Sequence, residues 1–175
     1  MRSLAPALFT ASLIACGAKA PIIGGPFPGD PENFTYDLEG TAVTLQKGMH
    51  EVKTGDKPDD LIATDLTGFR LDADLDGDAS TDRAVVLTRD EGTLKAHFLV
   101  VIRNPGGDVV ATKALRLGKN VLVEKLELAT EKGGPPGTFV VRMKGRDEDT
   151  PEDTPPTVDV AKKFRVKDGS IEPVK

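Results

Sequence analysis

The chain has 175 residues and a net charge of −5, with no Trp, one Tyr, seven Phe, 18 Gly and 13 Pro. A net-negative protein without a basic cluster is repelled by phosphate backbones, and scarce aromatic residues disfavour a stacking platform, so we expect no nucleic-acid partner. The one cysteine, Cys16, excludes an internal disulfide, a thiolate metal cage and a cysteine nucleophile in the domain that follows it.

The first 15 residues have the features of an export signal. Met1-Arg2 is a short positive region, and the small and apolar run of about a dozen residues after it is too short for a hydrocarbon layer that needs about 20. The segment Leu13-Ile14-Ala15-Cys16 resembles the bacterial lipobox. The resemblance implies cleavage after Ala15 and a lipid on Cys16; the alternative is an ordinary export signal with an incidental cysteine.

Residues 16–33 are expected to be the lipidated cysteine and a tether. The segment from residue 17 to residue 33 contains four Gly and four Pro with little hydrophobic periodicity, which predicts a spacer before a domain over residues 34–175. Gly17 stands where Asp would favour retention in the inner membrane. We therefore expect a lipid-anchored protein of the bacterial cell envelope, in the outer membrane and facing the periplasm or the surface if the host has two membranes.

From Phe34 onward, short β-favouring runs alternate with turn residues. This pattern predicts an all-β domain, a single antiparallel sandwich or a small barrel-like fold. Residues 138–144 and 158–166 alternate as half-buried strands do, whereas 84–87 and 97–102 have apolar side chains on both sides, which predicts central strands covered on both faces. A minor helix near Pro58 to Ala63 and a solvated loop at residues 146–156 are also expected.

The most specific internal feature is the aspartate-rich segment from Asp72 to Asp82. Carboxylates at alternate positions around a Gly let a short loop wrap its oxygens around one hard cation, and calcium is the natural candidate. A divalent ion would relieve the repulsion between these charges; the alternative is a solvated acidic turn without metal. The predicted ligands are the side chains of Asp74, Asp76, Asp78 and Asp82 and a backbone carbonyl near Ser80, completed by water.

The aspartate segment resembles the calcium loop of FG-GAP repeats, Asp-x-Asn-Gly-Asp-Gly-x-x-Asp, followed by an apolar strand, here Arg83 to Leu87. Ala79 stands where that pattern has its second Gly, and a left-handed backbone there would cost on the order of 1 kcal/mol. An EF-hand matches less well because its twelfth position would be Arg83 or Val85 instead of Glu. A single loop of this kind does not predict a propeller.

The chain from about Thr35 onward also resembles a family of bacterial lipoproteins. The motifs that carry this resemblance, in order, are Tyr36-Asp37-Leu38-Glu39-Gly40, Val43-Thr44-Leu45, the aspartate segment, Ala114-Leu115-Arg116-Leu117-Gly118, and a Pro-rich stretch before Lys163-Phe164-Arg165-Val166. The resemblance implies organisation and lends no activity.

No recognisable catalytic motif accompanies the two histidines, His50 and His97, or the many carboxylates. We therefore expect a non-enzymatic structural or interaction module of the envelope, held at the membrane by the lipid and in contact with an envelope partner. Two alternatives stay open. A deep pocket with converging polar groups would favour an envelope enzyme, and a broad exposed apolar patch would favour a metal-free accessory subunit of an envelope complex.

Overall fold

A computed structural model describes residues 25–57, 60–130, 135–147 and 149–174 of the chain. The described residues form an all-β fold with two short 3-10 turns, as the sequence predicts. The elements in chain order are η1 (Pro31–Asn33), β1 (Thr35–Leu38), β2 (Thr41–Thr44), β3 (Met49–Lys53), β4 (Leu61–Ala73), β5 (Asp82–Glu91), β6 (Leu94–Arg103), η2 (Pro105–Gly107), β7 (Val110–Ala111), β8 (Leu115–Lys119), β9 (Leu122–Leu128), β10 (Phe139–Gly145), β11 (Val158–Lys167) and β12 (Ser170–Val174).

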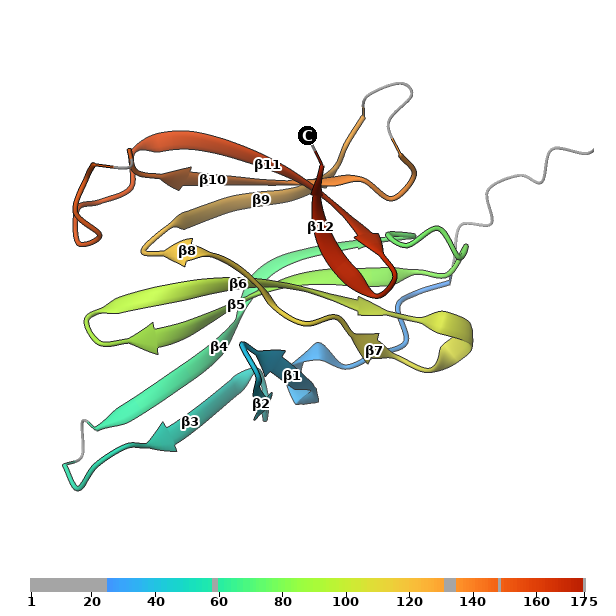
Figure 1. Cartoon of the computed structure of the whole chain (residues 1–175). Coiled ribbons are helices and arrows are strands. Elements are labelled where there is room, and N and C mark those ends of the chain that lie inside the picture. Colours follow the sequence, from blue (N-terminus) through green and yellow to red (C-terminus); the bar gives the residue numbers. More distant parts are fainter. Residues whose placement is uncertain (1–24, 58–59, 131–134, 148, 175) are drawn as a thin grey trace, which may run out of the picture.

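The strands form three antiparallel sheets (Figure 1). The largest has the order β3-β4-β5-β6-β7, with β8 also paired to β6; a four-stranded sheet has the order β12-β11-β10-β9, and β1 and β2 form a separate hairpin. In Figure 1 the four-stranded sheet lies on one side of β5 and β6 and the β1–β2 hairpin lies on the other. In the described part of the chain, no helix is long and apolar enough to cross a membrane.

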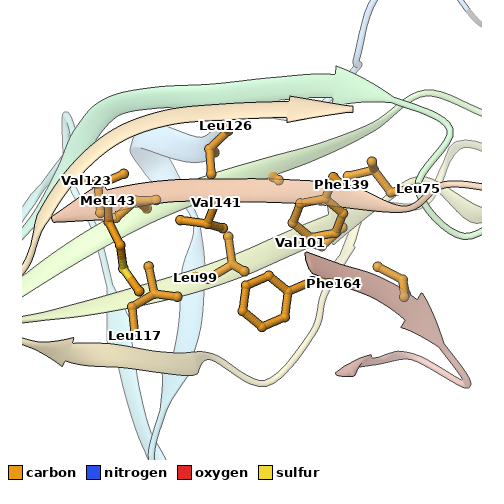
Figure 2. Packing of buried hydrophobic residues seen from close by; sticks show 13 residues of the cluster. Leu75, Leu99, Val101, Leu117, Val123, Leu126, Phe139, Val141, Met143 and Phe164 are labelled. Atoms are coloured by element: carbon orange, nitrogen blue, oxygen red, sulfur yellow. The ribbon is translucent and has the colours of Figure 1, made fainter. Parts of the chain in front are cut away.

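The central strands β5 and β6 have apolar side chains on both faces. On one face, Val86 and Leu99 belong to a cluster that includes buried side chains of β10 and β11 (Figure 2). On the other face, Val85 and Phe98 belong to a second cluster that includes Tyr36 of β1. The prediction of covered central strands at 84–87 and 97–102 is therefore confirmed, and the described residues form two cores that share one sheet.

The half-buried strands predicted near the C-terminus are also present. In β10, Phe139, Val141 and Met143 are buried while Arg142 between them is exposed. The neighbouring strand β11 carries Phe164 on the same core. Alternation of this kind arises because successive side chains of a strand point to opposite faces of the sheet.

The N-terminal packing begins before the predicted domain boundary at residue 34. The side chain of Phe27 is 8% exposed and belongs to the second cluster, and the guanidinium of Arg83 lies 4.6 Å from the centre of its ring. The hydroxyl of Tyr36 donates a hydrogen bond to the carbonyl of Pro31 in η1. The part of the expected tether from Phe27 to Asn33 is therefore in contact with the domain.

Two other expectations concern loops. The minor helix expected near residues 58–63 is wrong for Leu61 to Ala63, which begin β4; residues 58 and 59 lie outside the described part of the chain. Ile62 is paired with Val52 of β3, so backbone pairing across the hairpin decides the local conformation. The described residues of 146–156 form a mostly exposed connection between β10 and β11, as predicted.

A network of ion pairs covers one end of the second cluster. Arg89 and Arg116 lie 2.7 and 3.0 Å from Glu39, and they lie 2.9 and 2.7 Å from Glu91. Both guanidinium groups also lie over the ring of Phe98. The network therefore joins the β1–β2 turn to the central sheet.

Glu91 should make the stability of the fold depend on pH. The hydrogen bond from Arg116 is the main reason that the pKa of Glu91 falls from 4.5 to about 2, and Arg89 and Lys119 act in the same direction. Because the folded-state pKa is below the unfolded value, ionised Glu91 stabilises the fold above about pH 4.5, and this contribution is lost as the pH falls towards 2.

The variant Glu91→Gln should be less stable than the wild type by about 1 kcal/mol at pH 7. The difference should shrink between pH 5 and pH 2 in urea unfolding experiments. Asp153→Asn, in the exposed loop after β10, is the control and should follow the wild type across this range. A constant difference between Glu91→Gln and the wild type would contradict the role of the carboxylate charge.

Candidate metal centre

The aspartate loop connects β4 to β5 at one end of the central sheet. Ala73 and Asp82 form the last pair of these two strands, and residues 74–81 lie between them. Carboxylate oxygens of Asp74, Asp76 and Asp78 lie within 4.8 Å of one another. In the described residues, this is the one group of three metal-ligating side chains brought together in this way. The group could hold a metal ion.

Hydrogen bonds from the loop's own backbone hold these carboxylates in place. Asp74 accepts from the N–H groups of Gly77 and Ala79, at 2.7 and 3.1 Å. Asp76 accepts from Asp78 N–H at 3.2 Å. Bonds of this short range coil the chain around the carboxylates, as is typical of aspartate in turns.

The coil requires a left-handed backbone at two positions. Gly77 has a φ of +87° and Ala79 has a φ of +69°. Glycine adopts this conformation freely, whereas the Cβ of alanine makes it costly. The left-handed backbone considered for Ala79 is therefore present, and the missing second Gly leaves the loop under local strain.

Asp82 has a different role from the other predicted ligands. Its side chain is fully buried, and one oxygen accepts from Leu75 N–H at 2.9 Å and from Asp76 N–H at 3.2 Å. The other oxygen accepts from Asn104 N–H at 3.0 Å. Burial raises the pKa of Asp82, whereas the hydrogen bonds from the backbone of Asn104 and Leu75 act to lower it. Asp82 is not among the three clustered carboxylates, and its contacts close the base of the loop.

Leu75 anchors the loop from within. Although it stands between two aspartates in the sequence, its side chain is fully buried in the same cluster as Phe139 (Figure 2). Gly137, with a φ of +70°, lies so close that a Cβ on it would approach the carbonyl oxygen of Leu75 to 2.5 Å. The loop is therefore fixed to the core on one side and carries its carboxylates on the other.

Arg103, at the end of β6, is a neighbour of the site that the sequence did not indicate. Its guanidinium lies 3.6 Å from the carboxylate of Asp76, and it also lies near Gly169 in the turn between β11 and β12. One positive charge beside three carboxylates leaves an excess of negative charge. Such an oxygen-rich, negative site favours a hard divalent cation.

The remaining candidates are placed apart from one another. Ser80 donates its N–H to Asp78 at 2.7 Å, while the ligand role expected for its carbonyl stays a prediction. His50 is in β3, with its Nδ1 2.9 Å from the carbonyl of Thr44, and His97 is in β6, separated from β3 by the two strands β4 and β5. Burial lowers the pKa of His97. The structure therefore does not bring the two histidines into one site.

The comparisons with known proteins add no relative. The resemblances to the FG-GAP calcium loop and to a lipoprotein family therefore stay expectations from the sequence. No protein-family model, curated protein or solved structure matches this chain.

Proposed function

We propose that this chain is a lipid-anchored protein of the bacterial cell envelope, whose β domain is a non-enzymatic structural or interaction module with one calcium-binding loop. The observation that carries the calcium proposal is the group of three carboxylates from Asp74, Asp76 and Asp78. The membrane proposal is based on the sequence around Cys16, which lies outside the described residues.

The spacing of the carboxylates suits calcium. Calcium binds six to eight oxygens at roughly 2.3–2.6 Å, so two ligand oxygens can be about 5 Å apart across the ion. The oxygens of the group lie within 4.8 Å of one another. Because Asp74 and Asp78 are exposed, water and backbone carbonyls can complete the coordination. Magnesium is a poorer candidate because it requires a tighter octahedron and keeps much of its own water.

Calcium would act on the stability of the domain as well as on the loop. Three carboxylates in close proximity repel one another, and a bound divalent ion replaces this repulsion with attraction. Because Leu75 and Asp82 connect the loop to buried residues, the free energy gained when calcium binds the loop should raise the free energy of unfolding of the whole domain. A ligand that binds only the folded state stabilises it by RT ln(1 + [L]/Kd), so the melting temperature should rise with the logarithm of the free calcium concentration once that concentration exceeds the Kd.

The test is a calorimetric titration of calcium into the chelator-treated chain from residue 17 to residue 175. We expect saturable binding of one ion per chain and a higher melting temperature with calcium. In a matched variant, Asp74→Asn, Asp76→Asn and Asp78→Asn keep the side-chain size but remove the charge, and binding should be lost. This variant should fold, because its loop no longer contains mutually repelling charges.

The calcium proposal fails if the titration gives no heat and the melting temperature does not move up to millimolar calcium. Equal binding by the triple variant would place the ion elsewhere. Either result would leave the loop as a solvated acidic turn.

The membrane proposal predicts that Cys16→Ser releases the protein from the membrane fraction and abolishes labelling by a radioactive fatty acid. Ser12→Ala, which leaves Cys16 in place, is the control and should keep both properties. Tight membrane association of Cys16→Ser after a high-salt wash would contradict the lipid anchor.

A second candidate function is a metal-free accessory subunit that docks on another protein. The observation that favours it is a set of exposed apolar side chains on the hairpin of β3 and β4. Their exposed fractions are 47% for Met49, 46% for Val52, 43% for Leu61 and 39% for Ile62. Exposed apolar residues gathered on one hairpin are typical of protein contacts.

A further inference from the structure

Among the described residues, only the bridge between Gln46 and Met49 lies along the outer side of β3, so the rest of this strand is an unpaired edge of its sheet. It pairs with β4 and ends the strand order of the largest sheet. Figure 1 shows the hairpin extending beyond the rest of the fold, with β3 on its outer side. An edge strand of this kind presents unpaired backbone groups that another strand can bind.

The hydrogen bonds at both ends of β3 show which residues direct their backbone outward. Met49 exchanges backbone bonds with Gln46, on the side away from β4, whereas Thr54 donates to Asp60, on the side of the hairpin partner. Backbone direction alternates along a strand. Glu51 and Lys53 therefore direct their N–H and C=O groups to the free edge.

The same two residues carry opposite charges. Glu51 and Lys53 are both exposed, and in the described part of the chain neither forms an ion pair with another residue. Between them lies Val52, which faces the opposite side of the sheet and is paired with Ile62. The free edge thus consists of an acidic, an apolar and a basic residue in succession.

We propose that two copies of this chain associate through their β3 edges, antiparallel and with Val52 on the two-fold axis. In this register Glu51 of each copy lies opposite Lys53 of the other, and each such pair exchanges both of its backbone hydrogen bonds. Opposite charges directly across two strands stabilise the pairing. The registers centred on Glu51 or on Lys53 would instead place like charges opposite each other, so the charges select one arrangement.

The dimer would also cover part of the exposed apolar surface. The two Val52 side chains would meet, and Ile62 beside each would extend the contact into one apolar stripe. The paired edge is short, which supports a weak, concentration-dependent dimer rather than a permanent one. The association does not require the aspartate loop, which lies at the other end of β4.

The test uses the full chain with Cys16→Ser and Val52→Cys, so that position 52 carries the sole thiol. Residues opposite each other at a non-hydrogen-bonded position are about 4.5 Å apart at Cα, which permits a disulfide. Under mild oxidation, we expect at least a tenfold higher dimer yield than for Lys113→Cys, an exposed control position between β7 and β8.

Charge reversal then tests the register. In the same background, Glu51→Lys places lysine opposite lysine and Lys53→Glu places glutamate opposite glutamate, so each variant alone should lose most of the cross-linking. A mixture of the two variants restores opposite charges at both positions, and we expect heterodimers at close to the original yield. Unchanged melting temperatures would show that both variants fold.

The proposal is overturned if position 52 cross-links no faster than position 113. It is also overturned if charge reversal has no effect, or if the mixture does not restore the dimer. If β3 instead bound a strand of another protein, mixing the two variants would not restore the interaction, because neither substitution changes the charges of that other strand.

Discussion

Asp82→Ala is expected to lower the free energy of unfolding by about 3 kcal/mol, because it removes the buried acceptor of several backbone donors. The N–H groups of Leu75, Asp76 and Asn104 all donate to this one carboxylate. Without it, they would be left unpaired where the side chain is fully buried. Urea unfolding followed by circular dichroism measures the loss.

Asp78→Ala is the matched control because it removes an exposed carboxylate from the same loop. It should change the unfolding free energy by less than about 1 kcal/mol. Asp82→Asn, which keeps one acceptor oxygen and the side-chain shape, should lie between the two. A loss below about 0.5 kcal/mol for Asp82→Ala would contradict the structural role of this residue.

Gly137→Ala should destabilise the fold by about 2–4 kcal/mol, as an unfavourable backbone conformation and a steric clash both contribute. The added Cβ would lie 2.5 Å from the carbonyl oxygen of Leu75, and the φ of +70° is itself unfavourable for alanine. To relieve the clash, the aspartate loop must shift relative to the core. We therefore also expect weaker calcium binding in the calorimetric titration.

Gly77→Ala separates the two contributions. Gly77 has a φ of +87°, but nothing lies within 4 Å of the position that a Cβ would occupy. Its substitution should cost about 1 kcal/mol, from backbone conformation alone. Equal losses for Gly77→Ala and Gly137→Ala in the same urea experiment would mean that the contact with Leu75 contributes nothing.

The central sheet could be predicted because its pattern is local. A strand such as β6, with Phe98 and Val100 on one side and Leu99 and Val101 on the other, has no polar face to expose to water. It must therefore be covered twice. Likewise, the alternation in β10 and β11 identifies the face that packs on the core. These features depend on neighbouring residues within one strand.

Other parts of the fold depend on contacts between distant residues. Phe27 stands in a Gly- and Pro-rich segment, and its burial depends on the second cluster and on Arg83. In β4, the register with β5 shifts between Leu66 and Arg70, which interrupts the regular alternation along this long strand. Such contacts leave no periodic signal in the sequence.

The aspartate loop combines both cases. The spacing of Asp74, Asp76 and Asp78 predicted a common site, and the structure brings them together. The role of Asp82 could not be predicted, because one of its donors is Asn104, in another part of the chain. The burial of Leu75 also depends on residues far away in the sequence. Its position between two aspartates therefore predicts a loop residue, although it belongs to the core of the fold.

The position of Phe27 determines which end of the molecule an anchor would hold. Phe27 lies beside Arg83, next to the aspartate loop, and the 12 residues from Cys16 to Phe27 span at most about 40 Å. The hairpin of β3 lies at the far end of β4, roughly 40 Å from that loop. Because antiparallel pairing reverses the strand direction, a dimer through β3 would place the proposed lipid anchors of its two copies at opposite ends rather than side by side.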